Sequence, residues 1–306
     1  MATTKEIKNR IKGVKDTQKI TNAMYMIAST KLRKAKSELD HTRPYFNTLK
    51  TEIKRLFELD EDVENRFFYS NNGEHNSKGA FGILVITADK GLAGAYNQNV
   101  IKETLRLMKQ HEDTKLFVVG EYGRHYFTSH NISIERSFLY TAQNPTLGRA
   151  RQISNILVGL FKSECLSEID IIYTDMQGAI KSEVCSTRLL PFHRSYFIEN
   201  ENNARKTKAS FQFMPSIGTV LDNIVPGYIT GFIYSALIDS FCCEQNARMN
   251  AMDSANRNAQ KLLEELSVQY NHIRQAAITQ EITEVSSGAR SMRKKRKKKI
   301  SKEKIQ

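Results

Sequence analysis

A turn in the middle of the chain has residue types that can bind an anion. Residues 89–97 read Asp-Lys-Gly-Leu-Ala-Gly-Ala-Tyr-Asn, and they lie between an apolar run at 81–87 and a helical pattern at 97–111. A helix that begins just after a strand presents free backbone N–H groups to a phosphate. The glycine spacing is Gly-x-x-Gly, however, which matches neither the dinucleotide-binding fingerprint nor a P-loop. We therefore interpret Asp89, Gly91 and Gly94 as a structural turn, with an anion site as the alternative.

Other residues with reactive side chains show no catalytic or metal-binding spacing. The seven histidines have no metal-ligand pattern, and no serine or cysteine lies in a nucleophile motif. The four cysteines lack zinc spacing, and the adjacent Cys242 and Cys243 would point about 100° apart on a helix. We expect reduced thiols of a cytosolic protein. The sequence thus predicts no self-contained active site, no cofactor and no metal.

The elements around the turn alternate between strands and helices. Apolar runs at 81–87, 115–120 and 169–173 predict buried strands, 181–192 predicts a fourth, and 145–165 adds a second helix. Such alternation favours a mostly parallel sheet with helices packed on it. We therefore expect a central Rossmann-like α/β domain at 79–198, after a polar linker at 60–78. A capping-box pattern from Thr219 to Asp222 predicts the start of the next helix.

The two ends of the chain predict long helices that pair as an antiparallel coiled coil. Residues 241–292 contain no proline, and 241–288 as a helix would be roughly 70 Å long at about 1.5 Å per residue. Apolar residues in both ends recur at alternating steps of three and four, which is typical of a coiled-coil seam. We expect helices at 1–59, with Pro44 as a point of bending, and at 209–292. The seam residues are Ile7, Ile11, Val14, Gln18, Thr21, Tyr25, Ala28, Leu32, Ala35, Leu39, Phe46, Leu49, Ile53 and Leu56 in the first, and Met252, Ala255, Ala259, Leu262, Leu266, Gln269, Ile273 and Ala276 in the second.

The positive charge is concentrated at the C-terminus. The chain has a net charge of +13, and residues 293–306 contain nine basic residues and one acidic residue, a net +8 that leaves +5 for the other 292 residues. We expect this tail to be a disordered, solvated charge block. No run of about 18 apolar residues is present, so we expect no membrane span and no secretory signal. Two alternatives remain: a coiled-coil protein that binds nucleic acid, and a small α/β enzyme that uses the 89–97 turn on a phosphate.

Several longer motifs resemble the gamma subunit of rotary F-type ATP synthases. The opening at 7–24, the triplet Arg43-Pro-Tyr45 and the turn Asp-Lys-Gly-Leu-Ala-Gly-Ala-Tyr-Asn are similar to that family. The segment at 247–259, Ala-Arg-Met-Asn-Ala-Met-Asp-Ser-Ala-Asn-Arg-Asn-Ala, is more specific, as is the segment at 270–284. The resemblance covers about residues 4–289.

The resemblance implies a function that periodicity does not supply. The terminal helices would form a shaft inside a ring of alternating alpha and beta subunits, and the α/β domain would form a foot on the membrane c-ring beside the epsilon subunit. ATP would be made on beta, without a cofactor or nucleic acid on this chain. The location would be peripheral, on the cytoplasmic side of a bacterial cell membrane.

The resemblance also assigns contacts to individual positions. Met24 would face a lever loop of the beta subunit, with Arg248 in the shaft segment near it. Arg274, Gln275 and Thr279 match residues that touch the beta-subunit catch loop. Cys242 and Cys243 depart from the family pattern, and the tail at 293–306 has no usual counterpart.

Overall fold

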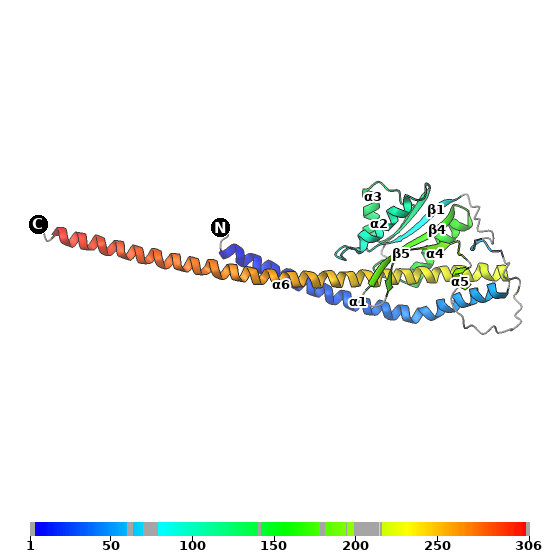
Figure 1. Cartoon of the computed structure of the whole chain (residues 1–306), viewed down its shortest axis with the longest axis horizontal. Coiled ribbons are helices and arrows are strands. Elements are labelled where there is room, and N and C mark those ends of the chain that lie inside the picture. The colour runs from blue at the N-terminus through cyan, green and yellow to red at the C-terminus, as the bar shows by residue number, and fades with distance from the viewer. Residues whose placement is uncertain are drawn as a thin grey trace. The chain divides into compact units, whose positions relative to one another are not determined.

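The computed structural model describes residues 4–59, 64–69, 79–139, 142–177, 181–193, 195–198, 214 and 216–303, with the ends of the chain in two long helices (Figure 1). The chain divides into two compact units: Met26–Ala251, and Met1–Tyr25 together with Met252–Gln306. The elements are, in order, α1 (Thr4–Leu59), β1 (Ala80–Ile86), α2 (Tyr96–Met108), β2 (Thr114–Val119), α3 (Glu121–Ser129), β3 (Arg136–Phe138), α4 (Leu147–Lys162), β4 (Leu166–Gln177), β5 (Lys181–Leu190), α5 (Ser195–Ile198) and α6 (Ile217–Glu303).

The unit Met26–Ala251 contains the predicted mostly parallel sheet. Its strand order is β3-β2-β1-β4-β5; the first four strands are parallel, and β5 is antiparallel to β4. The fourth predicted strand is therefore confirmed, in antiparallel orientation. β3 and α3 were not predicted, because three and nine residues are too few for a clear periodicity.

Helices cover both faces of this sheet. Leu84 and Ile86 of β1 share a core cluster with α4, whereas Ile83 and Val85 share a second cluster with α2 and α3. Successive side chains of a strand point to opposite faces, so one buried strand serves both cores. The α4 cluster also includes the second half of α1 and the first part of α6. The α/β domain and these helix segments therefore share one core.

The α6 helix begins earlier than its sequence pattern predicts. Ser216 Oγ accepts a hydrogen bond from the Thr219 backbone N–H over 3.3 Å, so Ser216 caps the helix. The predicted capping box, which placed Thr219 at the cap, is wrong by three residues. The predicted start at 209 lies outside the described residues.

In the other unit, the start of α1 packs along α6, and the two helices run in opposite directions (Figure 1). The Thr21 hydroxyl donates a hydrogen bond to Asn256 Oδ1. Ile7, Leu263 and Leu266 are buried in this unit. The predicted seam on α6 ends at Ile273, because every residue from 274 to 293 is exposed. The predicted seam positions Gln269 and Ala276 are also exposed, so that part of the prediction is wrong.

The C-terminal tail differs from the predicted disordered block. The backbone of α6 continues as helix to Glu303, and residues 304–306 lie outside the described part of the chain. Lysine and arginine are good helix formers, and the sequence has neither proline nor glycine after Gly288. The helix therefore has no local signal that would end it at Met292.

The first part of α6 is apolar enough to be compared with a membrane span. The residues Ile217–Arg293 contain an 18-residue stretch that, by length and composition alone, is apolar enough to cross a bilayer. However, 67% of that stretch is buried inside the protein. The core packing described above accounts for this apolar stretch without a membrane.

Asp239 makes the stability of this core sensitive to pH. The pKa of Asp239 is raised to about 6, mainly by burial and in part by Asp175 of β4, and Arg43 of α1 opposes the rise. An acid whose pKa is raised by folding contributes its full stability below its unfolded pKa, and that stability is lost as pH rises through the folded value.

We therefore expect Asp239→Asn to raise the free energy of unfolding by about 2–3 kcal/mol at pH 8 and to change it little at pH 4. Denaturant midpoints at the two pH values, at low protein concentration, measure the difference. Equal effects at both pH values would contradict the raised pKa of Asp239. The control is Asp253→Asn, because Asp253 forms an exposed i,i+4 ion pair with Arg257.

Candidate functional site: the turn after β1 and its contact with α6

The turn after β1 is held by its own side chains. The Asp89 carboxylate accepts hydrogen bonds from the backbone N–H groups of Glu121, over 2.9 Å, and Gln143, over 3.1 Å. Glu121 is the first residue of α3, so the carboxylate lies at the positive end of that helix. The Asn97 amide oxygen accepts from the Ala88 N–H over 2.9 Å. These contacts hold the turn against α3, which fits the structural-turn interpretation; the start of α2, where the alternative placed an anion, has no side-chain cap.

Two residues of the turn adopt left-handed backbone conformations. Leu92 has φ = 61° and Gly94 has φ = 55°. Glycine adopts this conformation without the steric cost of a Cβ atom, which explains Gly94. Gly91 has open space around the position of a Cβ atom, so packing does not explain its identity.

Arg248 connects α6 to this turn. Its Nη2 donates to the carbonyl oxygen of Gly91 over 3.0 Å and lies 3.4 Å from that of Lys90. Its Nη1 lies 2.5 Å from the Glu244 carboxylate, one helical turn earlier on α6. The side chains of Arg248 and Glu244 are only 11% and 8% exposed, so this ion pair is largely removed from water. Removal of one partner from a buried pair of this kind strongly destabilises the folded protein, because the other charge is left unpaired.

The surroundings of Glu244 are polar and largely closed to solvent. Burial raises the pKa of Glu244, and the nearby Arg248 guanidinium opposes that rise. Burial also raises the pKa of Tyr96, at the start of α2, and Glu244 adds to the rise. The Thr174 backbone N–H of β4 donates to Ser240 Oγ over 3.2 Å. The turn, α2, β4 and α6 therefore meet in one buried polar cluster.

The structure thus brings together residues that the sequence placed in separate predictions. Arg248 contacts the turn that contains Asp89 and Gly91, although Gly91 and Arg248 are 157 residues apart in the sequence. Glu244 was missed as a partner, and its i,i+4 spacing from Arg248 was an available signal. Tyr96 was missed because an aromatic residue at a helix start has no distinctive pattern.

The other predicted contact residues belong to the other compact unit. Met24 is half-buried on α1, and Arg274, Gln275 and Thr279 are exposed on α6. The Thr279 hydroxyl donates to the Gln275 carbonyl oxygen over 2.9 Å, which is a bond within the helix. These three exposed positions are therefore available to another chain.

A second charged cluster lies near the amino end of β4. Arg188 is bonded to Glu168 over 2.7 Å and to Asp170, and it contacts the Tyr69 hydroxyl. Tyr69 also donates to Glu168 over 2.9 Å, and burial raises its pKa to about 12. The cluster attaches the segment before β1 to the β4–β5 pair. Its polar groups bond one another, so we interpret it as a structural network.

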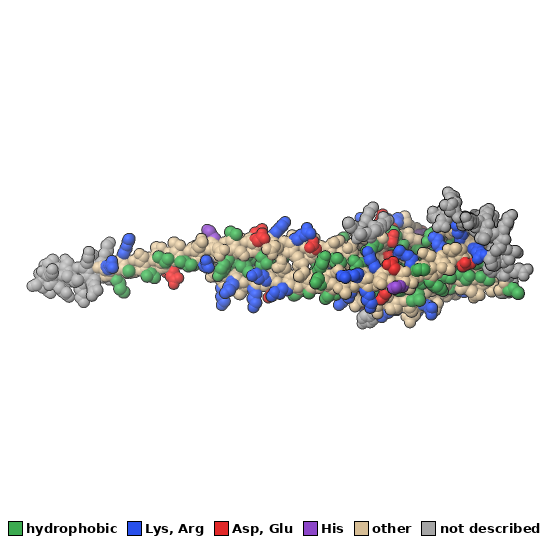
Figure 2. Space-filling model, turned by 90° about the horizontal axis from the view of Figure 1, so that it is seen from below, with side chains coloured by type: hydrophobic (Ala, Val, Ile, Leu, Met, Phe, Trp, Pro, Cys, Tyr) green, Lys and Arg blue, Asp and Glu red, His purple; other side chains and the backbone are tan. Residues whose placement is uncertain are grey.

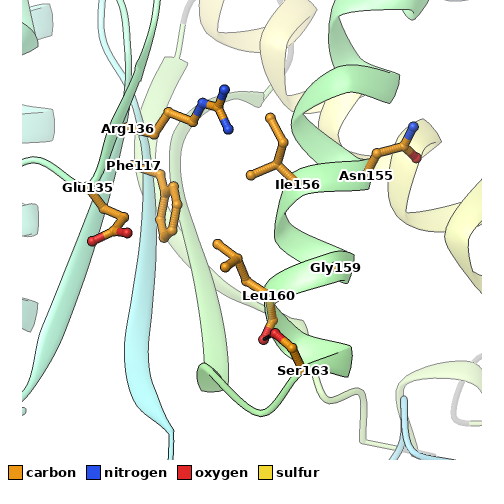
Figure 3. A pocket seen from close by; sticks show the side chains of 8 residues that line it. All are labelled: Phe117, Glu135, Arg136, Asn155, Ile156, Gly159, Leu160 and Ser163. Atoms are coloured by element: carbon orange, nitrogen blue, oxygen red, sulfur yellow. Dashed lines mark hydrogen bonds between the residues drawn. The ribbon is translucent and has the colours of Figure 1, made fainter.

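A cavity of about 550 Å³ lies between α4 and the β2–β3 edge of the sheet (Figure 3). In Figure 3 the apolar side chains of Phe117, Ile156 and Leu160 line its interior, and Arg136 extends toward α4. The Ser163 hydroxyl donates to the Leu160 carbonyl oxygen over 3.1 Å. The lining residues do not include a histidine or cysteine, and the described part of the chain has no cluster of acidic, histidine or cysteine side chains that would hold a metal.

The fold and site together define a class of protein with long terminal helices and an α/β domain. In this class the turn after β1 serves as an internal contact with α3 and α6. The sequence matches the family model for ATP synthase over residues 3–292. An ATP synthase gamma chain from Acetivibrio thermocellus is 38% identical over 96% of this chain and 100% of that protein, and one from Caldanaerobacter subterraneus is 40% identical over 93% and 98%. The chain therefore belongs to the ATP synthase family.

Solved structures show the same fold. A chain in a cryo-EM structure of the Euglena gracilis mitochondrial ATP synthase, OSCP/F1/c-ring, covers 94% of this chain with a TM-score of 0.67 and 17% identity. A second chain, from the rotor of that synthase, covers 90% with a TM-score of 0.61 and 16% identity. The predicted combination of an α/β domain with long terminal helices is confirmed by this likeness.

Proposed function

We propose that this chain is the central rotor shaft of an F-type ATP synthase, and that it couples transmembrane ion flow to ATP synthesis or hydrolysis on the beta subunits. The observation that carries the proposal is the unpartnered length of α6 beyond Ile273. Its exposed apolar residues Ile278, Ile282, Val285 and Met292 recur at steps of four, three and seven. Such a stripe needs a surrounding surface, which a ring of alpha and beta subunits supplies.

The described parts of the chain fit a non-catalytic role. The turn after β1 contacts α3 through Asp89 and α6 through Arg248, and the Ser163 hydroxyl at the cavity beside α4 donates to the Leu160 carbonyl oxygen, not to a base. In the assembly, the helices α1 and α6 serve as the shaft, and the α/β domain serves as the foot. The partners are the alpha and beta subunits, the epsilon subunit and the membrane c-ring.

The proposal assigns contacts with the ring to exposed positions on α6. Arg274, Gln275 and Thr279 lie where α1 no longer covers the helix, and their exposed side chains meet a loop of a beta subunit. Met24 on α1 meets a second beta-subunit loop. We place the complex at the cytoplasmic face of a bacterial cell membrane, with this chain as a peripheral component.

Co-expression of this chain with its alpha and beta subunits tests the function. Co-purification in one complex, with ATP hydrolysis that requires this chain, supports the proposal. Purification of alpha and beta without it would refute the proposal. Titration calorimetry of the purified chain with ATP checks the alternative of a phosphate-binding enzyme, since heat from tight binding would favour that alternative.

The surface of the paired helices predicts the behaviour of the chain alone. Green hydrophobic and blue basic side chains alternate along the exposed surface of the helices (Figure 2). Val268 and Val285 are each 70% exposed and Ile282 is 64% exposed, so apolar side chains meet water along α6. We expect the isolated chain to self-associate at low micromolar concentration, as measured by light scattering.

The substitution of serine for Ile278, Ile282 and Val285 together should reduce that association. Serine at Gln275, Thr279 and Thr283, on the same segment but off the stripe, is the matched control and should leave it unchanged. A wild-type chain that stays monomeric, with slow hydrogen exchange along residues 252–276, would contradict the expectation.

Removal of the basic end of α6 is expected to have a small effect on assembly and ATP synthesis. Truncation after Met292 removes a net charge of +8, but it removes none of the buried residues of the described chain. We expect assembly and ATP synthesis to change less than twofold, because solvated charges are screened beyond about 8–10 Å. Detachment of the truncated complex from vesicles at physiological salt would show that the tail contacts the membrane.

A further inference from the structure

The place where a sheet of this topology normally binds a ligand is filled by α6. The chain passes from β1 to β2 on one side and returns to β4 on the other, so the switch point lies between the carboxyl ends of β1 and β4. Open α/β sheets hold their ligands in the crevice outside this point. The pairing of β1 with β4 ends at Val85 and Ile172, and β4 continues beyond it to Gln177.

Residues 240–248 of α6 satisfy the groups that this crevice exposes. Ser240 Oγ accepts from the N–H of Thr174, two residues past the end of the β1–β4 pairing. Cys243 is 1% exposed and lies in one apolar cluster with Ala88, Ala93 and Tyr96. The cluster therefore includes the loop after β1 and the start of α2.

Arg248 closes the opposite side of the same contact. Its guanidinium bonds the carbonyl oxygens of Lys90 and Gly91, and Glu244 holds the guanidinium from within the helix. Arginine has five donors in a fixed planar arrangement, so one side chain can bind a carboxylate and two carbonyl groups at once. Lysine has one nitrogen atom and cannot reproduce this geometry.

We propose that residues 240–248 of α6 act as an internal ligand of the α/β domain, and that Arg248 is a positioning residue that fixes the rotation of α6 about its own axis. The apolar contacts of Cys243 hold the helix against the domain, and the buried side chains of residues 221–242 pack in the main core. The directional bonds of Arg248 and Ser240 resist rotation. This inference rests on the proposed rotor function only for its consequence, the transmission of torque from the domain to the shaft.

The first test measures the contact itself. In Arg248→Ala, amide hydrogen exchange at residues 90–95 should become about tenfold faster, because hydrogen bonds to a charged group are lost. Arg248→Lys should give an intermediate change. Arg257→Ala, which removes an arginine that is 77% exposed and paired with Asp253 at i,i+4, is the matched control and should leave the turn unchanged. Unchanged exchange in Arg248→Ala would overturn the proposal.

The second test replaces the arginine by a covalent link. Gly91→Cys and Arg248→Cys are combined in a Cys165→Ser background, and a short bifunctional methanethiosulfonate joins the two thiols in the assembled complex. A Cβ atom at Gly91 meets nothing within 4 Å, so the new cysteine should be tolerated. Mass spectrometry measures the link, and absence of the link would show that the two sites are not adjacent.

The functional outcome separates a positioning role from a direct contact with another subunit. Without the reagent, the double-cysteine complex should pump several-fold fewer protons per ATP than the Cys165→Ser complex. With the link, pumping should recover while the arginine remains absent. Failure to recover, with the turn again protected from exchange, would show that Arg248 acts on another subunit. A chain that never joins alpha and beta would refute the rotor function, yet the exchange test would still decide the contact.

Discussion

Gly231→Ala is expected to lower the free energy of unfolding by about 3 kcal/mol, although alanine is normally the better helix residue. A Cβ atom at Gly231 of α6 would lie 1.9 Å from Cδ1 of Phe46 on α1 and 2.4 Å from its Cγ. Phe46 is only 8% exposed, with the ring of Tyr234 6.4 Å away between centroids, so the phenyl ring has little space to move. Denaturant midpoints, at low protein concentration, measure the loss.

Gly227→Ala provides a control on the same helix. A Cβ atom there would have Leu49 as its nearest neighbour at 3.7 Å, which is ordinary contact. That substitution should therefore raise stability by about 0.5–1 kcal/mol, through helix propensity alone. Phe46→Leu combined with Gly231→Ala should recover part of the loss. Equal stability of the two single alanine variants would show that the helices do not approach closely at Gly231.

The helices were predictable because their signal is local and repeated. Every seam position predicted on α1, from Ile7 to Leu56, is buried or half-buried. The prediction failed on α6 beyond Ile273, since a heptad pattern continues whether or not a partner helix is present. The end of burial depends on where α1 begins, at Thr4, which no pattern within α6 contains.

The sheet was predictable in part for the same reason. Long apolar runs marked β1, β2 and β4, whereas β3 consists of three residues and has no recognisable pattern. The antiparallel direction of β5 fits the three residues that separate it from β4 in the sequence, because a parallel partner needs a crossover of a dozen or more residues. For the basic tail we predicted disorder from the density of like charges, although the helix propensity of lysine and arginine favoured the helix that the structure has.

The site required the tertiary structure. The turn at 89–97 and Arg248 each carried a recognisable motif, yet nothing local indicates that a guanidinium bonds carbonyl groups 157 residues earlier in the chain. The alternative of an anion site rested on free N–H groups at a helix start. That helix is α2, whose start has no side-chain cap, whereas Asp89 takes the N–H groups of Glu121 and Gln143, a contact that only the packing of α3 creates.

Met24→Lys is expected to uncouple the motor while it leaves ATP hydrolysis largely intact. Met24 is half-buried on α1, one helical turn from Ile20, which is 61% exposed. In the proposed rotor this side chain passes a loop of a beta subunit, so an ammonium group there forms or breaks partly desolvated ion pairs as the shaft turns. Such a pair changes a step by on the order of 1–3 kcal/mol. That amount is sufficient to retard one rotary step without abolishing chemistry on beta.

The measurement compares protons pumped per ATP hydrolysed in reconstituted vesicles. Met24→Leu keeps the size and polarity of the side chain and should behave as the wild type, and Asn9→Lys adds the same charge at an exposed position on α1. The ratio should fall several-fold in Met24→Lys alone and recover in part at high salt, because screening weakens the new ion pair. If hydrolysis and pumping decline together, the lysine has disturbed the packing of α1 on α6 near Thr21 and Asn256. In that case the stability of the paired helices should fall as well, and the contact between Met24 and beta would lose its support.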